Sequence, residues 1–123
     1  MYSFEECGEM LDEIADSVPY ELYRELSGGL RLVPQSKLHP KAVDNDLYIL
    51  GEYHRSSIGK YIIFYYGSIV RIYGRLPREQ FYEKLRKIFA HELRHHNEYL
   101  AGSDDLILYD NRHIGDYLIR KGK

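Results

Sequence analysis

The sequence lacks the features that would indicate an oxidising compartment or a membrane. It has no tryptophan and a single cysteine, Cys7, so no disulfide can form within the chain and a reducing compartment is the simpler expectation. No apolar run approaches the roughly 20 residues of a membrane span, and the polar N-terminus lacks the basic and apolar regions of a signal peptide. We therefore expect a cytoplasmic protein without a membrane partner.

An excess of one charge sign is also missing. The chain has 17 lysine and arginine residues against 19 aspartate and glutamate residues, which gives a net charge of -2. Without a basic excess, we expect no nucleic-acid partner. Apolar residues make up 44% of the 123 residues, which is ordinary for a globular protein. We therefore expect one domain, residues 1–123, with its own core.

The periodicity of apolar residues predicts the order of helices and strands. Ser3 and Glu6 fit a capping box before a helix at 4–18, and a shorter helix follows Pro19. Strands are expected at 30–33, 47–53, 61–66 and 69–73, with a turn at Gly67 between the last two. A long helix at 78–101 and a short helix at 113–120 complete the chain. This order predicts an α+β fold with N-terminal helices, a small mostly antiparallel or mixed sheet of about four strands, and a long C-terminal helix.

The long helix contains an HExxH motif formed by His91, Glu92 and His95. Two histidines four residues apart project to the same side of a helix, which suits two Zn–N bonds. The glutamate beside the first histidine is placed to take a proton from a metal-bound water. On the helix surface, Glu92 falls within the apolar stripe, and the two histidines fall at its edge. His96 points toward the stripe, so we expect it to pack in the core.

A catalytic zinc ion normally has three protein ligands, and the third is open. Glu98 follows on the same face of the helix, one turn beyond the motif. Asp104 and Asp105 follow Gly102, where the chain can reverse, and His113 is a further option without a spacing argument. Two other interpretations of the motif remain: a solvated face of mixed charge, and a glutamate that forms a structural ion pair with an arginine or a lysine.

Several segments resemble the small bacterial zincin-like metallopeptidase family across residues 4–118, namely DSVPYELYREL, GLRLVP, LYILGEYH and HELRHH. Many members carry HExxHxxGxxD, in which the glycine reverses the chain and the aspartate is the third ligand. Here Glu98 occupies the glycine position, and Gly102 with Asp105 repeats the Gly-x-x-Asp step further on. The resemblance implies one minimal zincin-like domain in which His91, His95 and Asp105 bind zinc, with Glu98 as the alternative third ligand.

The resemblance also implies a function, a zinc-dependent metallopeptidase in which Glu92 is the catalytic base and a peptide or protein is the substrate. The zinc ion need not be retained on purification. An edge strand would line the substrate cleft, and the candidate residues are Ile69, Val70, Arg71, Ile72 and Tyr73. The alternative is a non-catalytic binding or regulatory protein on a zincin-like scaffold with weak or absent metal. Arg94, in place of a small residue, favours this alternative.

Overall fold

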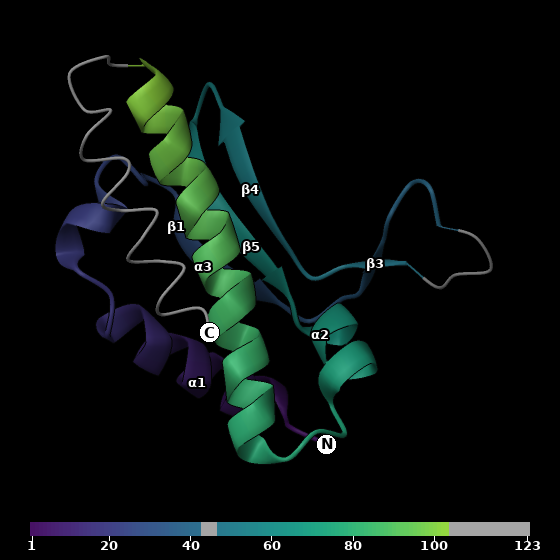
Figure 1. Cartoon of the computed structure of the whole chain (residues 1–123). Coiled ribbons are helices and arrows are strands. Elements are labelled where there is room, and N and C mark those ends of the chain that lie inside the picture. Colours follow the sequence, from purple (N-terminus) through teal and green to yellow (C-terminus); the bar gives the residue numbers. More distant parts are fainter. Residues whose placement is uncertain (43–46, 104–123) are drawn as a thin grey trace.

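The strands follow one another between N-terminal and C-terminal helices in an α+β arrangement (Figure 1), as the sequence predicts. The computed structural model describes residues 1–42 and 47–103, so Asp104, Asp105, His113 and the helix expected at 113–120 lie outside the described residues. The elements are α1 (Phe4–Asp16), the 3-10 helix η1 (Tyr20–Tyr23), β1 (Gly29–Val33), β2 (Lys37–Leu38), β3 (Tyr48–Ile49), β4 (Gly51–Ser56), β5 (Gly59–Tyr65), α2 (Tyr66–Tyr73) and α3 (Arg78–Ser103).

The first helix begins at the predicted capping box. The Ser3 hydroxyl accepts a hydrogen bond from the Glu6 N–H at 3.0 Å, and the Glu6 carboxylate accepts one from the Ser3 N–H at 2.8 Å. Two N–H groups that the helix itself leaves unpaired are thereby satisfied. The face that α1 buries consists of Cys7, Met10, Leu11 and Ile14. This spacing of three and four residues confirms the periodicity seen in the sequence.

The strands form two sheets rather than the single sheet of about four strands that we expected. The main sheet has three strands in the order β1-β5-β4, in which β1 is parallel and β4 is antiparallel to β5. The strands β2 and β3 form a separate two-stranded antiparallel ribbon. The short strand β2 therefore lies between the expected strands at 30–33 and 47–53, where no strand was predicted. The strand β4 lies at one edge of the main sheet, which matters for the site described below.

The predicted edge strand at 69–73 is wrong, because these residues belong to the helix α2. The residues Tyr66, Ile69, Val70 and Tyr73 are spaced by three and four, and all four lie in or against the core. That is a helical stripe, whereas the sequence interpretation took the same run as strand alternation. Gly67 lies in the first turn of α2, and its N–H donates to the Gln35 carbonyl at 3.2 Å. The segment therefore cannot line a substrate cleft as a strand.

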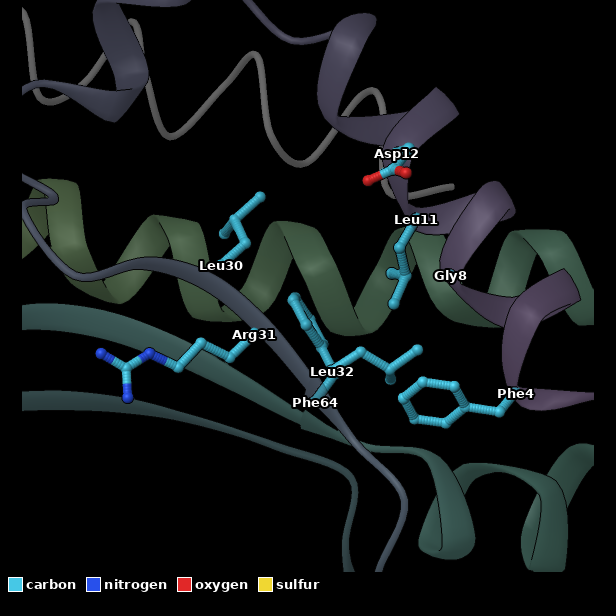
Figure 2. Close-up of a pocket in the computed structure, with 8 residues that line it drawn as sticks. All are labelled: Phe4, Gly8, Leu11, Asp12, Leu30, Arg31, Leu32 and Phe64. Carbon is cyan, nitrogen blue, oxygen red and sulfur yellow. The ribbon is translucent and has the colours of Figure 1, made fainter.

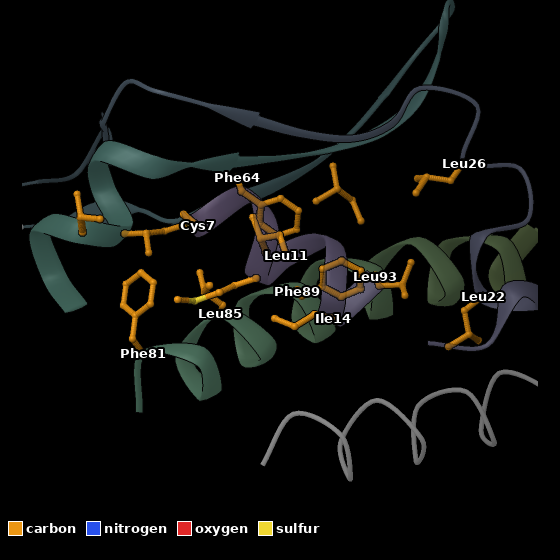
Figure 3. Packing of buried hydrophobic residues seen from close by; sticks show 14 residues of the cluster. Cys7, Leu11, Ile14, Leu22, Leu26, Phe64, Phe81, Leu85, Phe89 and Leu93 are labelled. Atoms are coloured by element: carbon orange, nitrogen blue, oxygen red, sulfur yellow. The ribbon is translucent and has the colours of Figure 1, made fainter. Parts of the chain in front are cut away.

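The long helix α3 packs with α1 on one side of the main sheet, and their apolar side chains fill the space between (Figure 3). Phe64 of β5 stacks on Phe89 of α3 with ring centroids 5.8 Å apart. Burying one such side chain contributes about 1.5–3 kcal/mol. Among the helices described, none combines the length and apolar character required to cross a membrane. The packing holds α3 beside β4 and thereby places the HExxH motif.

Candidate functional site at the edge of the sheet

The two histidines of the motif meet on the exposed edge of α3, as predicted. The Nε2 atoms of His91 and His95 lie 3.0 Å apart, and their rings are nearly perpendicular, at 84°. Partial burial, followed by the neighbouring His95, lowers the pKa of His91. The rings therefore share a hydrogen bond in which one ring nitrogen donates to the other.

This pair offers two metal ligands, but the described part of the chain does not complete a metal site. Glu98 lies near the other ring nitrogen of His95. Its Oε1 atom is 3.9 Å from Nδ1, whereas the two histidines face each other through their Nε2 atoms. Its other oxygen is engaged by Arg94 Nε at 3.3 Å. Among residues 1–42 and 47–103, no group of three or more histidine, cysteine, aspartate or glutamate residues could hold a metal ion. Asp105, the other predicted ligand, lies outside these ranges.

Glu92 is buried, as its position on the apolar stripe predicted, with only 7% of its surface exposed. Burial, and after it the nearby charge of Glu52, raise the pKa of Glu92 to about 7. A hydrogen bond from the backbone of Tyr53 acts in the opposite direction. The side chain has no ion pair with a lysine or an arginine among the described residues, so the interpretation as a structural ion pair is not supported.

A pocket of about 450 Å³ lies where α3 meets the start of β4. Its apolar wall is formed by Ile49, Leu50 and Ile88, and its polar residues are Lys87, His91 and Glu92. Gly51 completes the lining, and a Cβ atom at this position would lie 3.0 Å from Ile88 Cγ2 and 3.3 Å from Glu92 Cγ. The glycine therefore leaves the space that a side chain would fill.

A buried hydrogen-bond chain beside the pocket was not predicted. His96 is fully buried, and its Nε2–H donates to the Arg24 carbonyl at 2.7 Å. The Tyr53 hydroxyl then donates to His96 Nδ1, also at 2.7 Å. The sequence indicated that His96 packs in the core, but nothing in it indicated which residues pair with it. This chain of hydrogen bonds fixes β4 against α3 at Tyr53.

The other face of β4 carries a second polar cluster centred on Glu52. Its carboxylate accepts hydrogen bonds from Lys37 Nζ at 2.8 Å, Tyr65 Oη at 2.6 Å and His54 Nε2 at 3.0 Å. Burial alone would raise the pKa of Glu52, but these three donors outweigh it and lower the pKa to about 2. The alternation of polar and aromatic residues in LYILGEYH was the available signal for a strand with a wet face.

A smaller groove lies at the opposite edge of the sheet, between α1 and β1 (Figure 2). Its lining is mostly apolar and includes Phe4, Leu11 and Leu32, and its volume is about 180 Å³. Its two charged groups, Asp12 and Arg31, are exposed to solvent. The pocket at β4 is larger and contains the buried carboxyl group of the motif, so we place the candidate site there.

No family model matches the chain, and no curated protein matches it. A solved structure described as a conserved hypothetical protein from Thermo thermophilus is similar, with a TM-score of 0.71 and 29% sequence identity. The similarity covers 83% of this chain and all of the other. The description of that protein contains no activity.

These findings correct the predicted function. A zinc-dependent metallopeptidase needs a complete metal site, and the described residues supply only the pair His91 and His95. The similar solved structure adds no activity that would support hydrolysis. The prediction of a peptidase with Glu92 as its catalytic base is therefore wrong. The zinc ion as a cofactor stays a prediction.

Proposed function

We propose that the protein binds an extended segment of another protein along the open edge of β4. The observation that carries this proposal is the position of β4: it pairs with β5 on one side, and no strand among the described residues pairs with its other side. An unpaired strand edge is a template for adding a peptide strand, whose backbone provides affinity and whose side chains enter adjacent pockets.

The pocket beside this edge supports an apolar anchor in the partner. Ile49, Leu50 and Ile88 form a wall that suits a branched aliphatic side chain, and the volume of about 450 Å³ is within the usual range for ligand pockets. Lys87 and His91 provide polar groups in the same lining. The partner is therefore a segment in extended conformation with an apolar residue facing α3.

The edge of β1 is a poorer place for a strand to add. The groove beside it is smaller, and Pro34 follows its last residue. A proline is a common means of protecting an edge from pairing. The comparison of the two edges favours β4.

We also propose that the fold is a minimal zincin-like arrangement. The support is the long helix α3 with its HExxH motif, packed beside a mixed sheet whose edge strand β4 is antiparallel to its neighbour. This proposal concerns the architecture and carries no peptidase activity. An experimental structure that superposes poorly on zincin domains over α3, β4 and β5 would reject it. A cytoplasmic location and the absence of a nucleic-acid partner stay predictions.

Replacing Arg55 with proline tests the peptide proposal, because proline removes the backbone N–H of this residue and cannot pair with an added strand. The probe is a short fluorescent peptide of alternating threonine and valine, and binding is measured by anisotropy. We expect the wild type to bind and Arg55→Pro to lose about tenfold or more in affinity, roughly the effect of one or two lost hydrogen bonds.

Arg55→Ala is the matched control. The Arg55 side chain lies over the Tyr99 ring, with the guanidinium carbon 4.0 Å from the ring centroid, and alanine removes this contact while keeping the N–H. We expect Arg55→Ala to bind like the wild type. A second control is the same peptide methylated on alternate backbone nitrogens, which cannot pair as a strand. Equal binding of the two peptides, or of both Arg55 variants, contradicts strand addition.

A further inference from the structure

The face of the main sheet that points away from the core carries a row of planar side chains. Ile62 and Phe64 of β5 are buried in the core, so Tyr61, which precedes them in the alternation, points to the opposite face. His54 of β4 is paired with Tyr61 in the register of the sheet, so its side chain lies on the same face. Arg31 of β1 contacts the Tyr61 ring from the other neighbouring strand. We call Arg31, Tyr61 and His54 the outer row.

The members of the outer row are spaced like the strands that carry them. The rings of His54 and Tyr61 are nearly parallel, at 9°, and their centroids lie 5.0 Å apart. The guanidinium carbon of Arg31 lies 4.4 Å from the centroid of the Tyr61 ring. Neighbouring strands in a sheet lie about 4.7–4.9 Å apart, so stacking at this spacing continues from one strand to the next. Each of the two rings therefore turns a flat face toward the neighbouring strand.

His54 is the last member of the outer row, because β4 is the edge strand. Tyr61 covers one face of its ring, and no second ring among residues 1–42 and 47–103 stacks on it. The side chain keeps 35% of its surface exposed. Its Nε2 atom lies 3.0 Å from Glu52 Oε1, and this hydrogen bond restrains the ring. The imidazole is thus held in place, with its second face directed to where an added strand would lie.

The backbone of β4 brings an added side chain close to this face. The Tyr65 N–H donates to the Leu50 carbonyl at 2.9 Å, and hydrogen-bonded and non-hydrogen-bonded pairs alternate along an antiparallel pair of strands. In the observed register, the N–H and C=O groups of His54 therefore point to β5. Opposite His54, an antiparallel added strand would form a non-hydrogen-bonded pair, in which the Cα atoms are only about 4.5 Å apart and the side chains are closest.

We infer that the partner segment places an aromatic side chain against His54, so that the outer row continues onto a fourth strand. This inference rests on the proposed function and names the kind of segment that is bound. Aromatic rings form favourable pairs across neighbouring strands. An arginine suits the position less well, because Glu52, the carboxylate beside His54, already accepts hydrogen bonds from Lys37, Tyr65 and His54.

Alternation along the strand then defines the partner more fully. Side chains of successive residues point to opposite faces, so the neighbours of the aromatic residue would point toward α3. There they meet the pocket whose apolar wall is Ile49, Leu50 and Ile88. The partner is thus an extended segment in which an aromatic residue is flanked by aliphatic residues. The edge of β4 therefore selects its partner from both faces of the sheet.

The experiment compares two peptides and measures binding by anisotropy. One is the alternating threonine and valine peptide, and the other carries tyrosine in place of its central threonine. We expect the wild type to bind the tyrosine peptide about two- to tenfold more tightly, which is the usual contribution of an aromatic pair. In His54→Ala this advantage should disappear, so that both peptides bind about equally. His54→Phe is the matched control and should keep the advantage, because it keeps a ring at this position.

Two further peptides test whether the ring itself is recognised. Leucine in place of the tyrosine supplies apolar area without a ring, and arginine supplies a planar cation. Both should bind the wild type more weakly than the tyrosine peptide. Equal binding of the leucine peptide would show general apolar contact, equal binding of the arginine peptide would show recognition of a cation, and either result would overturn the inference.

The outcomes separate this inference from the proposed function. If the wild type binds the threonine and tyrosine peptides equally, or if His54→Ala keeps the preference or His54→Phe loses it, stacking on His54 is overturned while strand addition stands. If only the tyrosine peptide binds, and binding requires a ring at position 54 and the N–H of Arg55, both proposals are supported. If no peptide binds the wild type, both proposals fall.

Discussion

The carboxyl group of Glu92 titrates near neutral pH because the fold buries it. In an unfolded chain its pKa is 4.5, whereas burial raises the pKa in the folded protein to about 7. The folded state therefore favours the protonated form. The free energy of unfolding should fall as the pH rises from about 4.5 to about 7 and then level off, because above that range both states are ionised.

Glu92→Gln should remove this pH dependence. We expect the variant to gain stability relative to the wild type as the pH rises from 4 to 8, by about 3 kcal/mol in total, since one pKa unit corresponds to about 1.4 kcal/mol. Urea unfolding followed by circular dichroism at several pH values measures this. A constant difference between the two proteins across this range would contradict the shifted pKa.

The Tyr53 hydroxyl contributes to stability, because it donates a hydrogen bond to a buried nitrogen atom, His96 Nδ1. In Tyr53→Phe, the Nδ1 atom of His96 loses its donor and remains buried, which should cost about 1–3 kcal/mol. Tyr48→Phe is the control, since the Tyr48 ring is stacked beneath Arg71 and its hydroxyl has no comparable buried partner among the described residues. Equal stability losses in urea unfolding would argue against the importance of the His96 contact.

What could be predicted at individual positions followed from helix geometry. The spacing of His91 and His95 correctly brought the two rings together, and the apolar stripe correctly placed Glu92 and His96 in the interior. The partners of these groups come from Tyr53 and Arg24, which are distant in sequence. Only the packing of β4 and the η1 region against α3 brings them close, and periodicity within one helix does not reveal that.

Among the elements, α2 shows where a short apolar run is ambiguous. Ile69 to Tyr73 contains branched and aromatic residues that favour a strand, and Gly67 resembled a hairpin turn. The burial of Tyr66, Ile69, Val70 and Tyr73 shows that helical spacing decides the structure. Gly67 has a different role from the one expected: it lets the start of α2 approach the backbone before β2.

A matched pair of glycine substitutions tests this close approach. In Gly67→Ala, the new Cβ would lie 2.7 Å from the Ser36 nitrogen and 2.9 Å from the Gln35 carbonyl carbon, so the backbone must move. We expect a loss of about 1–3 kcal/mol. In Gly102→Ala, the new Cβ meets no heavy atom of residues 1–42 and 47–103 within 4 Å outside its own helix backbone and chain neighbours, and alanine should stabilise α3 by up to about 1 kcal/mol. Thermal unfolding of both variants measures the contrast, and losses of the same size would disprove the close approach.

For the molecule as a whole, Glu52 connects the two sheets. It lies on β4 of the main sheet and accepts hydrogen bonds from Lys37 on β2 of the ribbon and from Tyr65 on β5. Its pKa in the folded state is about 2, below the value of 4.5 for the free side chain. Folding therefore favours the ionised form, and the stabilisation present above about pH 4.5 is lost as the pH falls toward 2.

Glu52→Gln should cost about 2–3 kcal/mol at neutral pH, and this cost should shrink as the pH approaches 2. Acid unfolding of the wild type and the variant measures the difference. The control is Glu79→Gln, on an exposed position in the first turn of α3, which we expect to change stability by less than about 1 kcal/mol. A cost at Glu52 that stays the same at every pH would show that its donors do not lower its pKa.

The parallel pairing of β1 with β5 has a consequence for how the chain acquires its structure. During synthesis β1 leaves the ribosome before β5, since Gly29 precedes its partner Tyr61 in the chain. The hairpin of β4 and β5 closes locally, because Ser56 and Gly59 pair across the turn at 57–58. Contacts between nearby residues form faster than those that must close a long loop. We expect the nascent chain to form this hairpin first, and β1 to pair with β5 afterwards.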